Sequence, residues 1–335
     1  MSGTVLVTGG AGYIGSHVLL ALQARGRRVV VLDDLSTGSP EAVAGLDFVE
    51  GDVSDEALVA EVLRTRAVTS VIHFAASIMP PASISDPGAY YSNNTSASLT
   101  LARASIAAGV RAFVFSSSAA VYGDPERAPV RETDATRPIS PYGWSKLMTE
   151  IMLTDLSRAH PGFRPMSLRY FNVGGADPRG RTGQRGGPST HLIRAAVEAA
   201  LGRREQLEIY GVDYGTRDGT CERDYIHVTD LADVHVAALE HLEVDGEPDV
   251  LNCGYGRGYT VKEVIATLET IVGRRVPVTI GERRAGDAAR FVADVERLRR
   301  RLGWRPRYDS LEAILRTTLE WEKARGREAG SQARA

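Results

Sequence analysis

A glycine-rich turn near the start of the chain limits the folds that this sequence can adopt more than any other feature. The segment Thr8-Gly9-Gly10-Ala11-Gly12-Tyr13-Ile14-Gly15 lies between a short apolar run and a helical pattern. Gly9 permits a tight turn, Gly12 lets the backbone approach a pyrophosphate, and Gly15 lets helix and strand pack closely. Because helix N-terminal amides would then face the phosphates, the segment predicts a dinucleotide site.

An acidic residue, Asp33, ends the next apolar run and lies 18 residues after Gly15. At this spacing a carboxylate can receive the hydroxyls of an adenosine ribose. Residues 34–38 contain no Arg or Lys, so a 2′-phosphate would meet Asp33 without a cationic partner. The sequence therefore predicts NAD rather than NADP. Asp52, after the third apolar run, can receive the adenine amino group or simply cap the helix that follows, and the sequence leaves both roles open.

Short apolar runs alternate with helical patterns through the first half of the chain. The runs are continuous rather than alternating with polar residues, which is typical of a parallel sheet covered on both faces by helices. Right-handed crossovers then predict an α/β fold with a doubly wound parallel Rossmann sheet. We expect strands over 4–8, 28–32, 47–49, 70–74 and 112–116, with helices over 15–25, 55–64 and 96–108 between them.

The composition of the sequence changes after residue 171: residues 172–189 are rich in Gly, Pro and Arg and show little hydrophobic periodicity. We expect an NAD-binding Rossmann domain over 1–175, to which the chain returns over about 224–245. The run 224–228 could supply a strand to the large sheet in that return. A smaller α/β substrate-binding domain over 176–325 and a frayed tail over 326–335 complete the prediction.

Composition and charge exclude several classes of partner. The formal net charge is −2, which gives no electrostatic basis for binding nucleic acid. No apolar run approaches the ~18 residues that a membrane helix needs. Cys221 and Cys253 are too few for a disulfide framework or a zinc site, and no secretory signal precedes the first strand. We therefore expect a cytoplasmic protein with no metal, no membrane contact and no nucleic-acid partner.

A second constellation, Tyr142 and Lys146, is typical of proton transfer. Residues four apart share a helix face, so the phenol and the ammonium would converge. Lowering a tyrosine pKa from ~10 to near 7 takes about 4 kcal/mol of phenolate stabilisation, which a nearby cation can supply. Only three of the 40 basic residues are lysines, so Lys146 is unexpected on composition alone. The alternative is a helix pair at the surface without a catalytic role.

Ser118 lies in the segment 115–123, at the carboxyl end of a predicted strand. Ligands of open α/β sheets bind at that end of the strands. The Ser118 hydroxyl can bind the same substrate oxygen as Tyr142, or it can simply cap the strand end.

Three further segments carry a resemblance to a known family. They are Arg169-Tyr170-Phe171-Asn172, the run 213–228, which ends Arg-Asp-Tyr-Ile-His-Val, and Arg283-Arg284-Ala285-Gly286-Asp287. With the glycine turn and the Tyr–Lys pair, they make the chain resemble the extended short-chain dehydrogenase/reductases, and among them the UDP-glucose 4-epimerases, from residue 5 to about 321. The resemblance implies an NAD-dependent isomerase that interconverts UDP-galactose and UDP-glucose at C4 through a 4-keto intermediate.

The resemblance also assigns residues to the reaction, the cofactor and the substrate. It implies catalytic roles for Tyr142, Lys146 and Ser118. It implies cofactor contacts for Gly9, Gly12, Tyr13, Ile14, Gly15, Asp33, Asp34, Leu35, Ser36, Thr37, Gly38, Asp52, Val53, Phe74, Ala75, Ala76, Asn93, Ser116, Tyr142, Lys146, Tyr170 and Phe171. On the UDP-sugar side it implies Ser118, Tyr142, Asn172, His191, Leu192, Ile209, Tyr210, Arg223, Arg284, Asp287 and Phe291. The planar guanidinium groups of Arg223 and Arg284 suit a diphosphate, because each can bind two oxygens.

Two residues qualify this assignment. Glu222 stands beside Arg223 and is expected to weaken that arginine as a phosphate clamp. Phe291 stands where the family has a gate that sets pocket size, and a bulky ring there disfavours N-acetylated sugars. Epimerisation of another UDP-sugar, namely a glucuronate, a pentose or an N-acetylhexosamine, stays open as the alternative. His73 and His227 are expected to pack as hydrogen-bonded core residues rather than as ligands.

The resemblance implies a homodimer in which helices over 93–108 and 145–160 form a four-helix bundle, whereas the alternative is that these helices pack on the sheet alone. Two other functions fit the residues less well. A 4,6-dehydratase would need acids just after Ser118, where Ala119 and Ala120 stand. A non-catalytic NAD-sensing regulator would have no need of Ser118, Tyr142 and Lys146 together.

Overall fold

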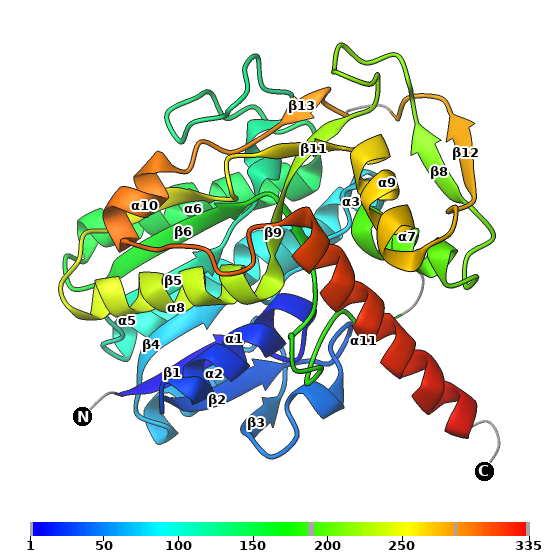
Figure 1. Ribbon diagram of the computed structural model, residues 1–335. Helices are drawn as coiled ribbons and strands as arrows, with labels where there is room; N and C mark the ends of the chain where they lie inside the picture. The colour runs from blue at the N-terminus through cyan, green and yellow to red at the C-terminus, as the bar shows by residue number, and fades with distance from the viewer. Residues whose placement is uncertain (1–2, 187–190, 285–286, 333–335) are drawn as a thin grey trace.

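Seven parallel strands form the largest sheet in the computed structural model, which describes residues 3–186, 191–284 and 287–332 (Figure 1). The strand order is β10-β6-β5-β4-β1-β2-β3, and each neighbouring pair runs parallel. The doubly wound sheet predicted from the sequence is therefore confirmed. Its strands are β1 (Thr4–Thr8), β2 (Arg28–Asp33), β3 (Asp47–Glu50), β4 (Val68–His73), β5 (Ala112–Ser116), β6 (Arg164–Tyr170) and β10 (Asp249–Cys253).

Helices cover both faces of this sheet because successive strand residues point to opposite sides. In β1, Val5 and Val7 join one buried cluster with the side chains of α1 and α8, whereas Leu6 joins another with those of α2 and α5. All three are fully buried, which explains the continuous apolar run. The helices are α1 (Tyr13–Ala24) and α8 (Val228–Glu243) on one face, and α2 (Glu56–Thr65), α5 (Ala97–Ala107) and α6 (Pro141–Ala159) on the other.

The order of the strands places a ligand crevice beside β1. The chain runs outward from β1 to β2 and β3, then crosses back to β4 on the other side of β1. At such a switch point, the loops that follow neighbouring strands diverge and leave room for a ligand at the carboxyl ends. The glycine turn lies there, between β1 and α1.

A second sheet carries the strand that the sequence suggested for the large one. Strand β9 (Glu222–His227) pairs with β7 (Asn172–Gly174), β11 (Gly258–Thr260) and β13 (Arg290–Phe291), so a strand over 224–228 in the large sheet is wrong. The buried carboxylate of Asp224 explains the pairing, since it accepts backbone N–H groups from Tyr255 and Gly256 at 2.9 and 2.8 Å and from Ala293 at 3.3 Å. The chain still returns to the large sheet through α8 and then β10.

A third buried cluster lies among α7 (Leu192–Ala200), α9 (Val261–Val272), α11 (Leu311–Gln332) and the paired strands β8 (Leu207–Tyr210) and β12 (Val278–Gly281). Figure 1 shows these elements grouped at one side, with α11 projecting from the body. Helix α11 continues to Gln332, within the tail that the sequence predicts to be frayed, and 333–335 lie outside the described residues. The buried Glu322 carboxylate fastens the helix, with Arg194 and Arg203 each at 3.0 Å.

Several short elements connect the longer ones. They are the 3₁₀ turns η1 (Pro40–Ala42) and η3 (Ala119–Tyr122), the π turn η2 (Tyr91–Ser96), and the helices α3 (Pro80–Ser85), α4 (Pro87–Tyr90) and α10 (Glu296–Leu302).

Among the described residues, no helix has the length and apolar character needed to cross a membrane.

Candidate active site

The glycine turn has the geometry of a phosphate cradle. Gly9 adopts a φ of +69°, and a Cβ atom at Gly15 would lie 2.3 Å from the Gly9 carbonyl oxygen. Helix α1 begins at Gly12 without a side-chain cap and without an acidic residue in its first turn. Its first amide N–H groups are therefore free of an internal anionic partner, which is what a pyrophosphate requires. The turn fits the dinucleotide that the sequence predicts.

Asp33 closes the loop next to this turn. Its carboxylate accepts backbone N–H groups from Ala11 and Leu35, each at 2.9 Å. Burial raises the pKa of Asp33, and these two hydrogen bonds oppose that rise. A Cβ atom at Gly38 would lie 2.7 Å from the Ala11 Cβ, so the segment 34–38 wraps closely around the turn. The structure thus brings the predicted ribose site and the glycine turn together.

Asp52 does not cap the next helix. Helix α2 takes its cap from Asp55, whose carboxylate accepts the Leu58 N–H at 3.0 Å. The Asp52 carboxylate accepts the Ser54 N–H at 2.7 Å instead. The capping role considered for Asp52 is therefore wrong. Val53, beside it, is buried in the core between α2 and the sheet.

The loop after β4 lies against the glycine turn. Phe74 donates its N–H to the Thr8 carbonyl at 2.9 Å, and a Cβ atom at Gly9 would lie 2.6 Å from the Ala75 nitrogen. Asn93 donates to the Ser77 hydroxyl at 2.9 Å. The loop that carries Phe74, Ala75 and Ala76 therefore lies against the glycine turn and is bound to Asn93 through Ser77. Tyr13 and Ile14 open α1, and the Tyr13 hydroxyl donates to the Gly175 carbonyl at 2.6 Å.

Ser118, Tyr142 and Lys146 converge at the carboxyl end of β5. Helix α6 begins at Ser140, whose hydroxyl accepts the Gly143 N–H at 3.2 Å, and Tyr142 and Lys146 lie on its buried face. The Ser118 hydroxyl lies close enough to the Tyr142 phenol to oppose the rise that burial causes in its pKa. The Ser118 hydroxyl also accepts the Ala120 N–H at 3.1 Å, so this serine caps η3 and contacts the phenol at once.

Burial opposes charge on both members of the Tyr–Lys pair. It raises the pKa of Tyr142, against the hydrogen bond from Ser118, and lowers the pKa of Lys146 to about 7, against the carboxylate of Glu150. The Lys146 ammonium lies 6.0 Å from the Tyr142 ring centroid and donates to the Ser116 carbonyl at 2.9 Å. Its hydrogen bond therefore goes to the end of β5 and not to the phenol.

Two aromatic residues expected near the cofactor lie beside this pair. The Tyr170 hydroxyl is 2.7 Å from the Ser116 hydroxyl, and burial raises the pKa of Tyr170. Phe171 is buried, and its ring centroid is 4.9 Å from that of Phe291. A predicted cofactor residue and a predicted substrate residue therefore touch each other.

The predicted diphosphate residues form a second cluster. Arg284 lies 3.0 Å from the Asp287 carboxylate and stacks on the Tyr210 ring at 4.4 Å. Arg223 lies 3.5 Å from the same carboxylate and donates to the Ala288 carbonyl at 2.7 Å. Asp287 thus holds both guanidinium groups near one point. Residues Ala285 and Gly286 of this motif lie outside the described residues.

The other substrate-side residues are spread over β7, β8 and α7. Asn172 is half-buried and opens β7, while His191 precedes α7 and has its pKa lowered by burial and by Arg194. Leu192 is half-buried at the first position of α7. The Ile209 side chain is buried within the third core, so only its backbone can face a ligand.

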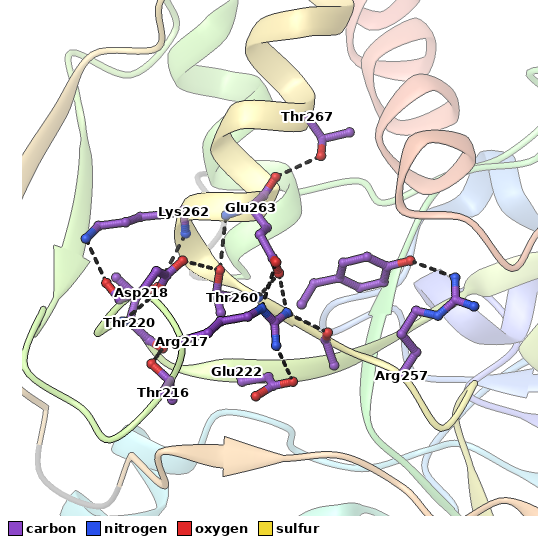
Figure 2. A network of polar contacts seen from close by, with 12 residues as sticks. Thr216, Arg217, Asp218, Thr220, Glu222, Arg257, Thr260, Lys262, Glu263 and Thr267 are labelled. Atoms are coloured by element: carbon purple, nitrogen blue, oxygen red, sulfur yellow. Dashed lines mark hydrogen bonds and ion pairs between the residues drawn. The ribbon is translucent and has the colours of Figure 1, made fainter.

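Glu222 does not weaken Arg223. Figure 2 shows its carboxylate with Arg217, at 2.8 Å, and Arg217 also binds Glu263 at 2.7 Å. Neighbouring strand residues point to opposite faces, so the Glu222 and Arg223 side chains diverge along β9. The expected interference is therefore wrong. The same network fastens the loop before β9 to α9, since Lys262 donates to the Asp218 carbonyl at 2.8 Å.

The two histidines considered in the sequence are hydrogen-bonded core residues. The His73 ring nitrogens lie 2.7 Å from the Thr8 hydroxyl and 2.8 Å from the Ser98 hydroxyl, and burial lowers its pKa to about 3. His227 lies 3.0 Å from the Thr317 hydroxyl. Both expectations are confirmed.

Sequence reasoning missed Asn94, a buried residue in the π turn η2. Its amide group accepts the Ser77 N–H at 2.8 Å and donates to the Ser145 hydroxyl at 3.0 Å. It thereby ties the loop after β4 to the helix that carries Tyr142. π turns are frequent at functional sites, but the sequence carries no simple signal for one.

Comparisons with known proteins agree with this geometry. The NAD dependent epimerase/dehydratase family matches residues 5–254. The UDP-glucose 4-epimerase of Azospirillum brasilense is 55% identical over 321 residues, which cover 96% of this chain and 92% of that protein. The crystal structure of UDP-glucose 4-epimerase from Brucella ovis in complex with NAD has a TM-score of 0.92 and 46% identity, covering 95% of this chain and 98% of that one.

A further solved structure widens the range of named substrates. The UDP-Glc/GlcNAc 4-epimerase of Campylobacter jejuni is 42% identical, with a TM-score of 0.85 and coverage of 96% of this chain and 100% of that one. The family match spans most of the chain, and the reported relatives cover 95–96% of it at 42–55% identity. The chain therefore belongs to the NAD dependent epimerase/dehydratase family.

Proposed function

We propose that this chain interconverts UDP-galactose and UDP-glucose by NAD-dependent epimerisation at C4. The observation that carries the proposal is the convergence of Ser118 and the buried Tyr142 at the end of β5, with Lys146 one helical turn further along α6 and bound to the Ser116 carbonyl at 2.9 Å. These groups lie at the carboxyl ends of the strands, the edge of the sheet that also bears the glycine turn. Family membership and the names of the matched relatives support the same activity.

Each catalytic residue has a defined task in this reaction. Tyr142, as phenolate, takes the proton from the sugar O4, and the Ser118 hydroxyl steers that proton by binding the same oxygen. NAD, when bound, supplies the acceptor and later the donor of the C4 hydride. Tyr142 returns the proton after the 4-keto sugar has turned over in the pocket. Lys146 holds the nicotinamide ribose and stabilises the phenolate with its charge.

The cofactor and the nucleotide occupy opposite sides of this centre in the proposal. The amides at Gly12 hold the pyrophosphate of NAD, and Asp33 receives its adenosine ribose. Arg223 and Arg284 hold the diphosphate of the UDP-sugar, with Asp287 fixing their orientation. Anchoring the diphosphate while the sugar is free to rotate is what allows the hydride to return to the opposite face of C4.

The aromatic pair Phe171 and Phe291 favours hexoses without an N-acetyl group. The two rings fill the space at the sugar end of the site with centroids 4.9 Å apart. An N-acetyl substituent needs room that this contact occupies, so glucose and galactose are the proposed sugars. Epimerisation of another UDP-sugar is the alternative.

We propose a homodimer that forms through α6 and its neighbour α5. Trp144, Met148 and Ile151 lie at positions i, i+4 and i+7 of α6 and are 41%, 39% and 53% exposed. Their spacing makes one apolar stripe on the face of the helix that points away from the sheet. A second copy of the same stripe would cover it, as in a four-helix bundle.

The proposed compartment is the cytoplasm, where Cys221 and Cys253 stay reduced. Both thiols are buried and free. The proposed units are an NAD-binding domain over 1–175, completed by α8 and β10, and a UDP-sugar-binding domain over 176–325.

The experiment that tests the function is a product assay with the purified full chain. UDP-galactose is incubated without added NAD, and UDP-glucose is measured by chromatography, beside UDP-glucuronate, a UDP-pentose and UDP-N-acetylglucosamine. Formation of UDP-glucose at the highest rate supports the proposal. Turnover confined to another UDP-sugar would replace the substrate, and no turnover of any of them would reject the activity.

A further inference from the structure

A buried ion pair lies directly beneath the proposed catalytic residues. Glu150 follows Lys146 by one helical turn on α6 and is 4% exposed, and Arg169 on β6 is 6% exposed. The guanidinium group binds the carboxylate in bidentate fashion, with Nε at 2.9 Å from one oxygen and Nη2 at 2.6 Å from the other. A bidentate pair of this kind fixes orientation as well as charge.

The Glu150 carboxylate also holds the end of β5. It accepts the hydroxyl of Ser117, which stands between two residues of the site. The carbonyl of Ser116 receives the Lys146 ammonium, and the hydroxyl of Ser118 contacts the Tyr142 phenol. One carboxylate on α6 therefore sets the distance between that helix and the strand end that carries its two hydrogen-bonding partners.

Arg169 extends the connection to the turn after Ser118. Its Nη1 donates to the Tyr122 hydroxyl at 2.9 Å, and that hydroxyl donates to Asn252 at 2.7 Å. Tyr122 is the last residue of η3, the turn that Ser118 caps. The pair thus ties together α6, the end of β5, η3 and β10. Of these elements, α6 carries the phenol and the ammonium, and the end of β5 supplies the carbonyl that binds the ammonium.

We propose that Glu150, held by Arg169, is a positioning residue for the epimerase reaction: it fixes Ser118, Tyr142 and Lys146 relative to one another and keeps Lys146 in its ammonium form. This inference rests on the proposed function. A buried ion pair adds little net stability compared with apolar side chains of the same size. Its value here lies in geometry and in the negative charge that it places one turn from a buried lysine.

The charged groups around Lys146 support the electrostatic half of the proposal. Burial lowers the pKa of Lys146 to about 7, and the Glu150 carboxylate raises it. From β4, His73 faces the same region and is neutral at pH 7, because burial lowers its pKa to about 3. From β6 come Arg169, which is bound to Glu150, and Tyr170, whose raised pKa keeps it neutral. Glu150 is therefore the group that favours the ammonium.

The test compares Glu150→Gln with a matched control elsewhere in the same sheet. Glu243 on α8 also accepts a bidentate Arg, Arg27 at 2.9 and 2.6 Å, and a serine hydroxyl, Ser70 at 2.6 Å. That pair lies at the amino ends of the strands, away from the site. Glu243→Gln therefore removes the same type of interaction without touching the reaction. Glu150→Asp keeps the charge, and Ser117→Ala removes only the hydroxyl.

Three quantities are measured on the full chain with its NAD: kcat as a function of pH, the temperature of thermal unfolding, and the titration of the Tyr142 phenolate. The phenolate is followed by its near-ultraviolet absorbance, from which the absorbance of the Tyr142→Phe chain is subtracted. For Glu150→Gln we expect kcat to fall at least about tenfold. The alkaline limb of its kcat–pH profile should move to lower pH, because Lys146 loses its proton at a lower pH. The Tyr142 phenolate should then form at higher pH, since it has lost the nearby positive charge. Glu150→Asp should keep the alkaline limb of the kcat–pH profile at the wild-type pH. Ser117→Ala should lower kcat several-fold but leave the pH of that limb unchanged. Glu243→Gln, at a less buried pair, should lower the unfolding temperature but keep the wild-type kcat and pH profile.

Equal losses of activity in the two Gln variants, in step with their stability, would overturn the proposal. So would an unshifted pH profile in Glu150→Gln. If Glu150→Gln does not fold, wild-type kcat in both Ser117→Ala and Glu150→Asp would overturn the positioning role. A wild-type chain without epimerase activity would reject the proposed function instead, and the phenolate titration would still report on Glu150.

Discussion

Phe171 and Phe291 stand 120 residues apart in the sequence, yet their rings meet at 4.9 Å between centroids and are tilted by 45°. One follows β6 and the other belongs to β13, so the contact joins a predicted cofactor residue to a predicted substrate residue. The register of β13 against β9, which pairs Phe291 with Arg223, fixes the ring in this place.

Phe291→Ala tests whether this ring limits the size of the sugar. Removing it opens space beside Phe171, so activity on UDP-N-acetylglucosamine should rise relative to UDP-glucose. A change of at least about tenfold in the ratio of the two kcat/KM values is expected, since a lost clash acts on one substrate only. Steady-state kinetics with both sugars measure it, and an unchanged ratio would exclude Phe291 as the gate.

Gly15→Ala tests the glycine turn. A Cβ atom at this position would lie 2.3 Å from a backbone oxygen of Gly9, which cannot move aside as a side chain could. We expect a loss of about 1–3 kcal/mol in the free energy of unfolding and loss of bound NAD during purification. Gly162→Ala is the control, because a Cβ atom at that position would have no other atom within 4 Å. Retention of NAD by Gly15→Ala at the level of the control would contradict the cradle.

Lys146→Met tests the cost of burying the ammonium. The pKa of Lys146 is about 7 in the folded chain and ~10.4 in an unfolded one. Between these values the unfolded chain holds a proton that the folded chain has released, so this lysine makes stability rise with pH in that window. Below it, the folded chain carries the full penalty of the buried charge.

NAD-free Lys146→Met should therefore be more stable than wild type by a few kcal/mol at about pH 6, and the difference should shrink toward about pH 9. Chemical denaturation at both pH values measures it. Lys323→Met, at an exposed lysine, should show no such trend. A pH-independent difference for Lys146→Met would mean that the ammonium carries no burial penalty.

Ile151→Glu tests the dimer. A charge in the middle of the apolar stripe of α6 should split a dimer into chains of 36.1 kDa without changing the fold. Ile280→Glu is the matched control, since that isoleucine is 67% exposed on β12, far from α6 in Figure 1. Sedimentation at micromolar concentration reports the mass. A wild-type chain that sediments as a monomer would refute the dimer.

The sequence predicts the large sheet well because its strands are buried on both faces, so runs such as Val5–Leu6–Val7 are apolar without interruption. The glycine turn, Asp33 and the Tyr142–Lys146 pair could be found for a similar reason. Each is a local pattern whose spacing is set by one turn or one helix.

Features that depend on distant partners could not be found in this way. Strand β9 leaves the large sheet because the Asp224 carboxylate binds backbone groups of residues 31 to 69 positions later. Helix α11 is held by ion pairs of Glu322 with Arg194 and Arg203, which lie 128 and 119 positions earlier in the chain. The divergence of Glu222 from Arg223 follows from strand alternation, but only once 222–227 is known to be a strand.

Tyr142 is the proposed base for the sugar O4, and the variant Tyr142→Phe is the most direct test of that role. The variant keeps the ring and its packing but cannot accept the proton. With UDP-galactose and no added NAD, we predict that the variant retains NAD and UDP binding while its rate of UDP-glucose formation falls by at least about 10². Tyr308→Phe, whose ring stacks on the core residue His227, should keep the wild-type rate. A Tyr142→Phe rate within a few-fold of wild type would contradict the account.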